Sequence, residues 1–165
     1  MALVAGLGES PALFQSPLGL WVAYLVQARL GAASELSLEL LQLSERLGIG
    51  DLALLAHLAA VCSRYWSGQP SKVLSHAEKG MTLYDQGRHE GHKLLFQDPA
   101  VTVLSHQALA LWLLGYPDQA NEKSAKSIVL ARVVGHPFSL SVALEWDAFL
   151  RSMRQEPNLV ADRAT

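Results

Sequence analysis

The segment Ala100–Pro137 reads AVTVLSHQALALWLLGYPDQANEKSAKSIVLARVVGHP, and it decides the expected fold. Two helical stretches flank the turn Gly115-Tyr116-Pro117-Asp118, and Gly135-His136-Pro137 ends the second one. Glycine readily takes the left-handed conformation that ends a helix, and proline is favoured at the first position of the next one. The segment therefore predicts a helical hairpin, and we interpret the rest of the chain as imperfect copies of it.

Glycines recur at the expected corners of these copies. Gly31 and Gly68 are 37 residues apart (68 − 31), and Gly68 and Gly115 are 47 apart (115 − 68). Five residues after each glycine stands a residue that we expect to touch the partner helix: Leu36, Val73 and Ala120. An insertion over 85–98 lengthens the second interval. Without about ten inserted residues, the units approach the roughly 34–40 residues of helical-hairpin repeats.

A corner glycine followed by a small residue five positions later is typical of tetratricopeptide hairpins. Relative to Gly115, the small residue expected before the corner is Ala108, which fits the pattern. The aromatic residue expected in the second helix is Ser124, which does not fit. We therefore predict an all-α fold: a right-handed stack of degenerate tetratricopeptide-like hairpins, an α-α superhelix of about seven helices.

The expected repeat domain covers residues 17–154. We expect hairpins over about 18–47, 51–84 and 99–134, followed by a terminal helix over 137–154. The first helix is expected to end at Leu30, before Gly31. Residues 1–16 are interpreted as an irregular lead-in and residues 155–165 as a frayed tail.

Composition excludes several classes of function. Half of the 165 residues are hydrophobic and 17% are charged, which favours helices buried on more than one side. The net charge of −2 provides no basic surface for nucleic acid. Cys62 is the single cysteine, so an intrachain disulfide is excluded and a reducing, cytoplasmic location is expected. The apolar N-terminus lacks the basic flank of a signal peptide, so we expect no signal peptide. No apolar run is long enough to predict a membrane span.

Three segments resemble the C-terminal helical-repeat region of large bacterial multidomain regulators: LGLWVAYLVQARLGAASELSLELLQLSERLG, LYDQGRHEGHKLLFQDPAV and HQALALWLLGYPDQANEKSAKSIVLARVVGHPFSLSVAL. Those regulators are ATPases that often carry an N-terminal nucleotide-cyclase or kinase domain. The resemblance covers about Ala12 to Arg154, and Leu111–Ala120 is its most specific part. It implies an interaction or regulatory module. The chain has no G-x-x-x-x-G-K loop and no acidic metal pair in a strand context, so neither ATP binding nor cyclase activity is expected of it.

No set of residues is arranged as a catalytic or metal site. The sequence His89-Glu90-Gly91-His92 supplies at most half of a zinc site. His57 and His106 lie in apolar helical segments, where a hydrogen-bonded core or groove histidine is the simpler interpretation. Glu145 and Asp147 are two residues apart and therefore lie on different sides of a helix. We predict no catalytic residue, no metal, no cofactor and no enzyme activity for this chain.

Aromatic residues mark two expected binding surfaces. If first helices line the inner surface of the superhelix, counting back from each corner glycine predicts a groove. Its expected residues are Trp21, Tyr65, Trp66, His106, Leu109 and Trp112, with Leu25, Cys62, Thr102 and Ser105 at other inner positions. The alternative is that these aromatic side chains pack between hairpins. The terminal helix is expected to present an interface through Phe138, Trp146 and Phe149. Self-association is one use of this interface.

The expected function is a non-catalytic protein–protein interaction or regulatory scaffold module of bacterial signalling, with a protein or peptide partner bound in the groove. Two alternatives stay open. One is a detached regulatory fragment of an ATP-binding nucleotide-cyclase or kinase regulator. The other is a sensor that binds a small ligand in the repeat groove.

Overall fold

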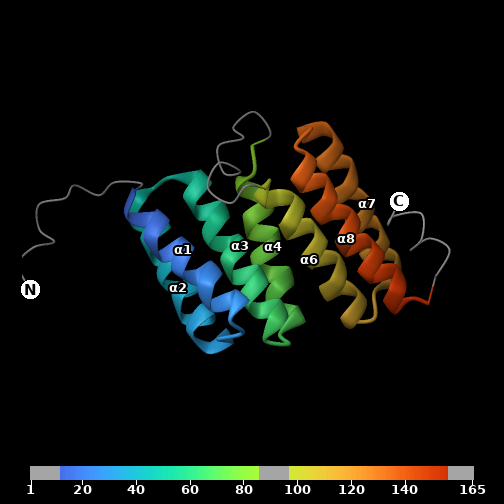
Figure 1. Ribbon diagram of the computed structural model, residues 1–165, viewed down its shortest axis with the longest axis horizontal. Coiled ribbons are helices and arrows are strands. Elements are labelled where there is room, and N and C mark those ends of the chain that lie inside the picture. Colours follow the sequence, from blue (N-terminus) through green and yellow to red (C-terminus); the bar gives the residue numbers. More distant parts are fainter. Residues whose placement is uncertain (1–11, 86–96, 156–165) are drawn as a thin grey trace, which may run out of the picture.

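The computed structural model describes residues 12–85 and 97–155. Within these residues the chain forms helices and no strand: α1 (Ala12–Val26), α2 (Leu30–Leu47), α3 (Gly50–Trp66), α4 (Pro70–Leu83), α6 (Pro99–Leu113), α7 (Pro117–Val134) and α8 (Pro137–Met153). Each helix packs against the next one along the chain (Figure 1). The prediction of an all-α stack of helical hairpins is confirmed.

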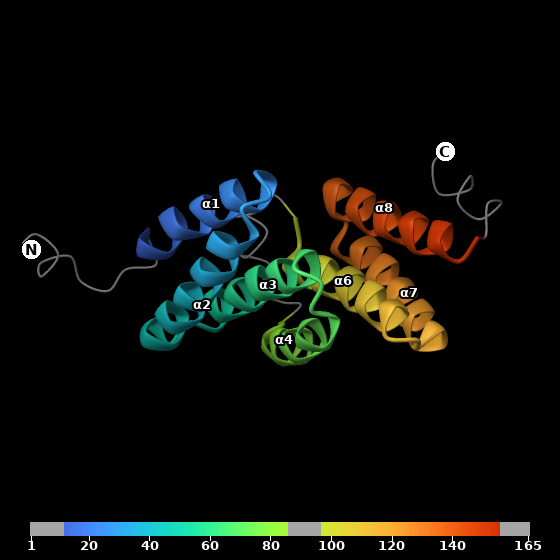
Figure 2. The same ribbon diagram turned by 90° about the horizontal axis from the view of Figure 1, so that it is seen from below.

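Three hairpins pair α1 with α2, α3 with α4, and α6 with α7. The first helices of these hairpins also contact one another, α1 with α3 and α3 with α6, and α8 continues this row by packing on α6. In Figure 2, α1 and α8 both lie above the row formed by α3 and α6, one toward each end of it, and α4 lies below that row. We refer to α1, α3, α6 and α8 as the first helices.

The corner inside each hairpin has one repeated backbone geometry. Ala28, Gly68 and Gly115 each have a positive φ, of 56°, 69° and 85°. Each donates its N–H to the carbonyl three residues earlier, and the following residue donates to the carbonyl five residues earlier. Paired bonds of this kind satisfy the last carbonyls of a helix. The three hairpins therefore turn in the same way.

The expected corner at Gly31 is wrong. The first helix ends at Val26, and Gly31 lies in the first turn of α2 with an ordinary negative φ. Ala28 takes the left-handed conformation instead, and the Arg29 guanidinium lies 4.3 Å from the centre of the Tyr24 ring beside it. With Ala28 as the corner, the residue five positions on is Ala33, which is fully buried like its counterparts Val73 and Ala120.

The expected irregular lead-in over 1–16 is wrong for its last residues. Helix α1 begins at Ala12, and Phe14 is fully buried in the cluster that also holds Leu18 and Trp21. Burial of this ring stabilises the helix despite Pro17, which removes one backbone donor. Residues 1–11 and 156–165, including most of the expected tail, and most of the 85–98 insertion lie outside the described residues.

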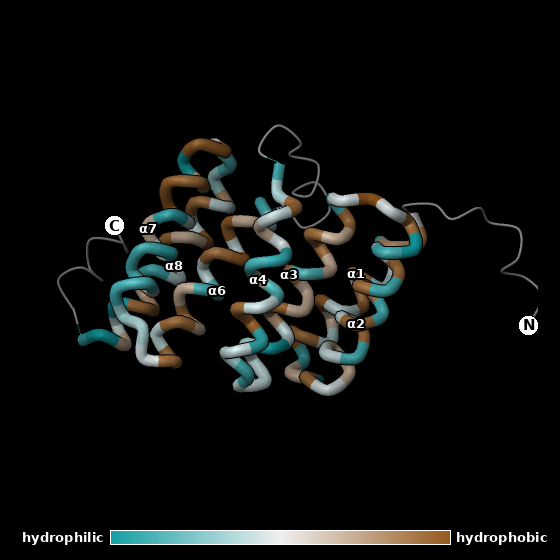
Figure 3. Tube along the Cα trace, turned by 180° about the vertical axis from the view of Figure 1, so that it is seen from behind, coloured by the Kyte–Doolittle hydropathy of each residue, from teal (hydrophilic) through white to brown (hydrophobic). Residues whose placement is uncertain are grey.

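Helices α3 and α6 form the centre of the core. Both are apolar on nearly every side, and their buried residues include Leu55, Leu58, Val101 and Leu109. The second helices α2 and α4 bury one face each, and hydrophilic residues are interspersed along them in Figure 3. This difference follows from position, because a helix with neighbours on several sides must be apolar all round.

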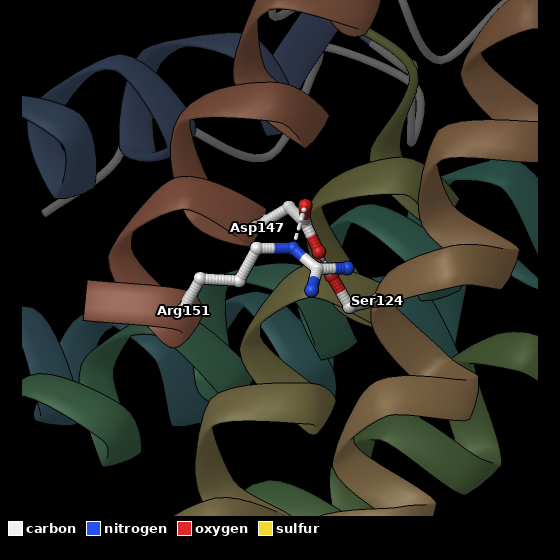
Figure 4. A network of polar contacts seen from close by, with 3 residues as sticks. All are labelled: Ser124, Asp147 and Arg151. Atoms are coloured by element: carbon white, nitrogen blue, oxygen red, sulfur yellow. Dashed lines mark hydrogen bonds and ion pairs between the residues drawn. The ribbon is translucent and has the colours of Figure 1, made fainter. Parts of the chain in front are cut away.

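Two buried carboxylates fix the C-terminal part of the stack. Asp98 caps α6, accepting bonds from the backbone N–H groups of Ala100 and Val101, and its own N–H donates to Ser139 Oγ of α8. Asp147 of α8, only 1% exposed, accepts a hydrogen bond of 2.6 Å from Ser124 Oγ of α7 and one of 2.8 Å from Arg151 Nε (Figure 4). These bonds hold α8 against α6 and α7.

Helix α8 ends in the way that the other first helices end. Arg154 donates its N–H to the Leu150 carbonyl, and Gln155, at φ 60°, donates to the Ser152 carbonyl. Gly115 and the residue before it make the same pair of bonds at the end of α6. By this criterion α8 occupies the place of the first helix of a further repeat.

Candidate functional site

A cavity of about 510 Å³ lies between the four first helices. Such a volume is within the usual range for ligand sites, about 300–1,000 Å³. Its walls are apolar for the most part, and aromatic rings from α1, α3 and α8 contribute much of them. The lining residues are Gly19, Trp21, Val22, Leu25, Leu58, Cys62, Trp66, Gln97, Thr102, His106, Phe138, Val142 and Trp146.

An aromatic cluster forms the wall between α3, α6 and α8. Trp146 lies at its centre, with ring-centre distances of 4.8 Å to His106, 6.2 Å to Trp66 and 6.2 Å to Tyr65. Tilted and edge-on contacts at such distances are the favourable geometries for aromatic pairs. Trp66 nevertheless keeps 51% of its surface exposed, and Phe138 keeps 53%. The cavity is therefore bordered by large aromatic surfaces that are accessible from outside.

The α1 side of the cavity is fixed by a buried hydrogen bond. Trp21 donates from its indole Nε1 to Ser63 Oγ at 2.9 Å, and Ser63 donates to the Ala33 carbonyl. The Trp21 ring is thus held in one orientation. Gly19, two residues before Trp21 in α1, also lines the cavity, and a Cβ there would meet no atom within 4 Å.

The polar residues of the cavity are neutral. His106 Nδ1 lies 2.9 Å from the Thr102 carbonyl, and because a carbonyl only accepts, Nδ1 carries the ring proton. Burial lowers the pKa of His106 to about 4, although its hydrogen bond to the Thr102 carbonyl opposes this shift. Burial likewise raises the pKa of the Cys62 thiol to about 12. None of the described lining residues carries a formal charge.

Thr102 lines the cavity, but its hydroxyl oxygen is itself buried and is not satisfied by the described part of the protein. The residue is 4% exposed, and its Oγ1 has no hydrogen-bond partner within the described parts of the chain. Leaving a buried hydroxyl without a partner costs about 1–3 kcal/mol.

Three of the six expected groove residues, Trp21, Trp66 and His106, line the cavity. Tyr65 belongs to the aromatic cluster but does not line the cavity. Trp112 is half-buried outside the cavity, where the Arg154 guanidinium lies 5.6 Å from its ring centre. Of the other expected inner positions, Leu25, Cys62 and Thr102 line the cavity, whereas Ser105 bonds to Ser127 of α7.

Leu109 does not belong to the cavity, which corrects its expected place in the groove. It is 1% exposed and packs in a cluster with Ala108, Leu111 and Leu150. The reason is the position of α8, which covers this side of α6. Counting along one helix identifies a face, but it does not show which neighbour covers that face.

The expected terminal interface is part of the same surface as the groove. Phe138 and Trp146 line the cavity, and the Phe149 ring lies 6.0 Å from that of Trp146. Val142, which the sequence analysis did not select, completes a stripe with Phe138 and Trp146 at intervals of four residues. That spacing is the signal by which the α8 wall could have been found.

The other histidines that the structure describes form no complete metal site. His57 Nδ1 and His76 Nδ1 lie 3.2 Å apart between α3 and α4, so that one donates a hydrogen bond to the other. Within residues 12–85 and 97–155 no three metal-binding side chains come together. His89 and His92 lie outside the described residues. None of the described helices is long and apolar enough to cross a bilayer.

Comparisons with protein-family models, with curated proteins and with solved structures find no match to this chain. The fold and the site define an all-α stack of helical hairpins with an uncharged, aromatic-walled cavity between its first helices.

Proposed function

We propose that the chain is a non-catalytic binding module that takes an uncharged, apolar segment of a protein partner into the cavity between the first helices. The observation that carries this proposal is the combination of exposed aromatic surface with a lining that has no formal charge. Aromatic side chains supply most of the energy in many protein interfaces. A charged segment would lose its hydration in the cavity and gain no opposite charge there.

The test uses peptides selected against the intact chain from a displayed random library. Trp66→Ala removes a large exposed ring from the cavity wall, and we expect it to weaken the selected peptides by about 30-fold, the loss typical of an anchor residue. Leu113→Ala is the matched control, because Leu113 is 54% exposed and does not line the cavity. Equal binding by both variants, or a library that yields no peptide dependent on Trp66, contradicts the proposal.

A second candidate is a sensor for a small apolar ligand. It is favoured by the cavity volume of about 510 Å³, which lies within the usual range for ligand sites. A ligand at 100 times its dissociation constant would stabilise the chain by about 2.7 kcal/mol, which thermal unfolding detects. A screen of neutral aromatic metabolites that shifts wild type but not Trp66→Ala would favour this candidate over a peptide.

The wider role, a regulatory module in bacterial signalling or a detached fragment of an ATPase, cyclase or kinase regulator, rests on the sequence resemblance. If the segment bound in the cavity belongs to a second copy of the chain, this binding is self-association. Sedimentation velocity over a range of concentrations tests this form: a Trp66-dependent dimer supports it, and a strict monomer directs the search to other proteins.

A further inference from the structure

Five basic side chains lie along the contact between α3 and α4. His57 and Arg64 are seven residues apart in α3, which places them on one face, two turns from each other. In α4, Lys72, His76 and Lys79 are spaced by four and then three residues and also share a face. The two faces meet where His57 Nδ1 and His76 Nδ1 lie 3.2 Å apart. We refer to these five residues as the basic cluster.

No described carboxylate balances the charge of the basic cluster. Burial and then the charges of basic neighbours lower the pKa of His76 to about 4, and these neighbours are His57, Arg64, Lys79 and Lys72. Glu78, the acidic residue of α4, stands two residues from His76 and therefore on another side of the helix. Within the described residues none of the three cations, Arg64, Lys72 and Lys79, has an ion-pair partner. The cluster thus holds three positive charges around a neutral histidine pair.

Packing does not require basic residues at this place. Counted back from the corner glycine of each hairpin, His57 and Arg64 of α3 correspond to Leu104 and Leu111 of α6, which are only 6% and 5% exposed. An apolar pair therefore suits the repeat, whereas like charges close together oppose folding. Lys72 is exposed and Arg64 is half-buried, so the cluster can be reached from outside.

We propose that the basic cluster binds a phosphate group, with Arg64, Lys72 and Lys79 supplying the positive charge and the histidine pair an N–H donor. His76 lies one helical turn from each lysine, so a group beside it is near all of these charges. One ring of the pair uses its single proton in the shared hydrogen bond, and the other ring therefore carries its proton at Nε2.

Charge and size favour phosphate over other anions. A phosphate monoester has about two negative charges at pH 7 and three strong acceptor oxygens, which suits several cations better than a single carboxylate does. The distance from Lys72 to Lys79 along α4 is about 10 Å, too short to follow a nucleic-acid strand. The net charge of −2 also opposes a long polyanion.

The experiment titrates inorganic phosphate into the full-length chain at pH 7, with chloride holding the ionic strength constant, and follows the histidine ring signals by NMR. We expect the signals of His57 and His76 to move along one saturable curve. The expected dissociation constant is on the order of a millimolar, as for a few exposed charge-assisted contacts. The His106 signal is the internal control and should not move, because this ring lines the cavity instead.

Surface variants identify the cations without disturbing the core. Lys72→Gln and Lys79→Gln should each weaken phosphate binding about fivefold, the upper end of the range for an exposed ion pair. Lys126→Gln is the matched control, because it removes the same charge from the exposed surface of α7 and should leave the affinity unchanged. Equal affinity in the wild type and in both cluster variants overturns the proposal, as does a shift that chloride alone reproduces.

A phosphoserine peptide, compared with its unphosphorylated form and with free phosphate, distinguishes the sources of the group. Tighter binding of the phosphopeptide than of free phosphate supports the site and identifies a phosphorylated protein segment. Equal or weaker binding supports the site and identifies a small phosphate compound. An oligonucleotide whose affinity rises with its length overturns the proposal in favour of a polyanion surface. The basic cluster shares no residue with the cavity, so these outcomes leave the proposed function to its own test.

Discussion

Alanine is expected to have opposite effects at two glycines, because the structure places the first corner at Ala28. Gly31 lies in the first turn of α2, and a Cβ there would meet no atom within 4 Å. Gly31→Ala should therefore act only through backbone freedom and stabilise the chain by about 0.5 kcal/mol. Gly115 has a φ of 85°, so Gly115→Ala forces an L-residue into the left-handed region, at a cost of about 1–2 kcal/mol.

Urea unfolding followed by far-UV circular dichroism measures both effects. The two variants should differ by about 2 kcal/mol, or about 1 M in the unfolding midpoint for an m-value of about 2 kcal/mol/M. Gly68→Ala, with a φ of 69°, is the control and should behave like Gly115→Ala. If Gly31→Ala destabilises the chain as much as the other two, the corner lies at Gly31. The register of α1 would then be wrong, and with it the placement of Trp21 in the cavity.

Three further predictions concern Asp147, two histidines and Gly19. Asp147→Ala should lower the free energy of unfolding by about 3 kcal/mol, measured in urea, because it strands the donors of Ser124 and Arg151; an effect below about 1 kcal/mol would contradict the network. Stability should fall as pH drops from 6.5 towards 4, because burial lowers the folded-state pKa of His76 and of His106 to about 4, whereas the same side chains take up protons near pH 6.5 in the unfolded chain. Thermal unfolding measured across this pH range should show a smaller loss of stability in His76→Gln than in the wild type. Gly19→Leu should leave thermal stability unchanged or raised, because the new side chain enters open space. The same variant should no longer bind the selected peptides whose binding depends on Trp66.

Most helices could be predicted because glycine and proline residues mark their boundaries. Gly68-Gln69-Pro70 and Gly115-Tyr116-Pro117 each give a left-handed residue, an intermediate one and a first helical proline. The corner Ala28-Arg29-Leu30 makes the same turn with neither residue type. The cost of the left-handed conformation at Ala28 is offset in part by the contact of the Arg29 guanidinium with the Tyr24 ring. No local sequence pattern predicts this contact.

The cavity could be predicted only in part, for a related reason. Counting back from the corners found Trp66 and His106, because the inner face of a first helix follows from helical geometry. It also found Trp21, because the expected corner at Gly31 lies three residues, nearly one helical turn, from the observed corner at Ala28. The count also selected Leu109, which α8 covers. It treated Phe138 as part of a separate interface, whereas the packing of α8 on α6 turns it toward the cavity. Which faces stay open depends on contacts between distant helices, and these are set by packing as a whole.

Gly19 separates what the fold needs from what the cavity needs. A glycine in the middle of an exposed helix face costs about 1 kcal/mol relative to alanine. Close packing does not require it, since no atom lies within 4 Å of a Cβ built there. Gly80 is the contrasting case, because a Cβ there would lie 3.2 Å from His57 Cβ, and α3 and α4 could not approach as closely. The structural consequence of glycine at position 19 is instead the open space that it leaves at the cavity wall. A residue that costs helix stability and preserves a cavity is expected where binding depends on that space.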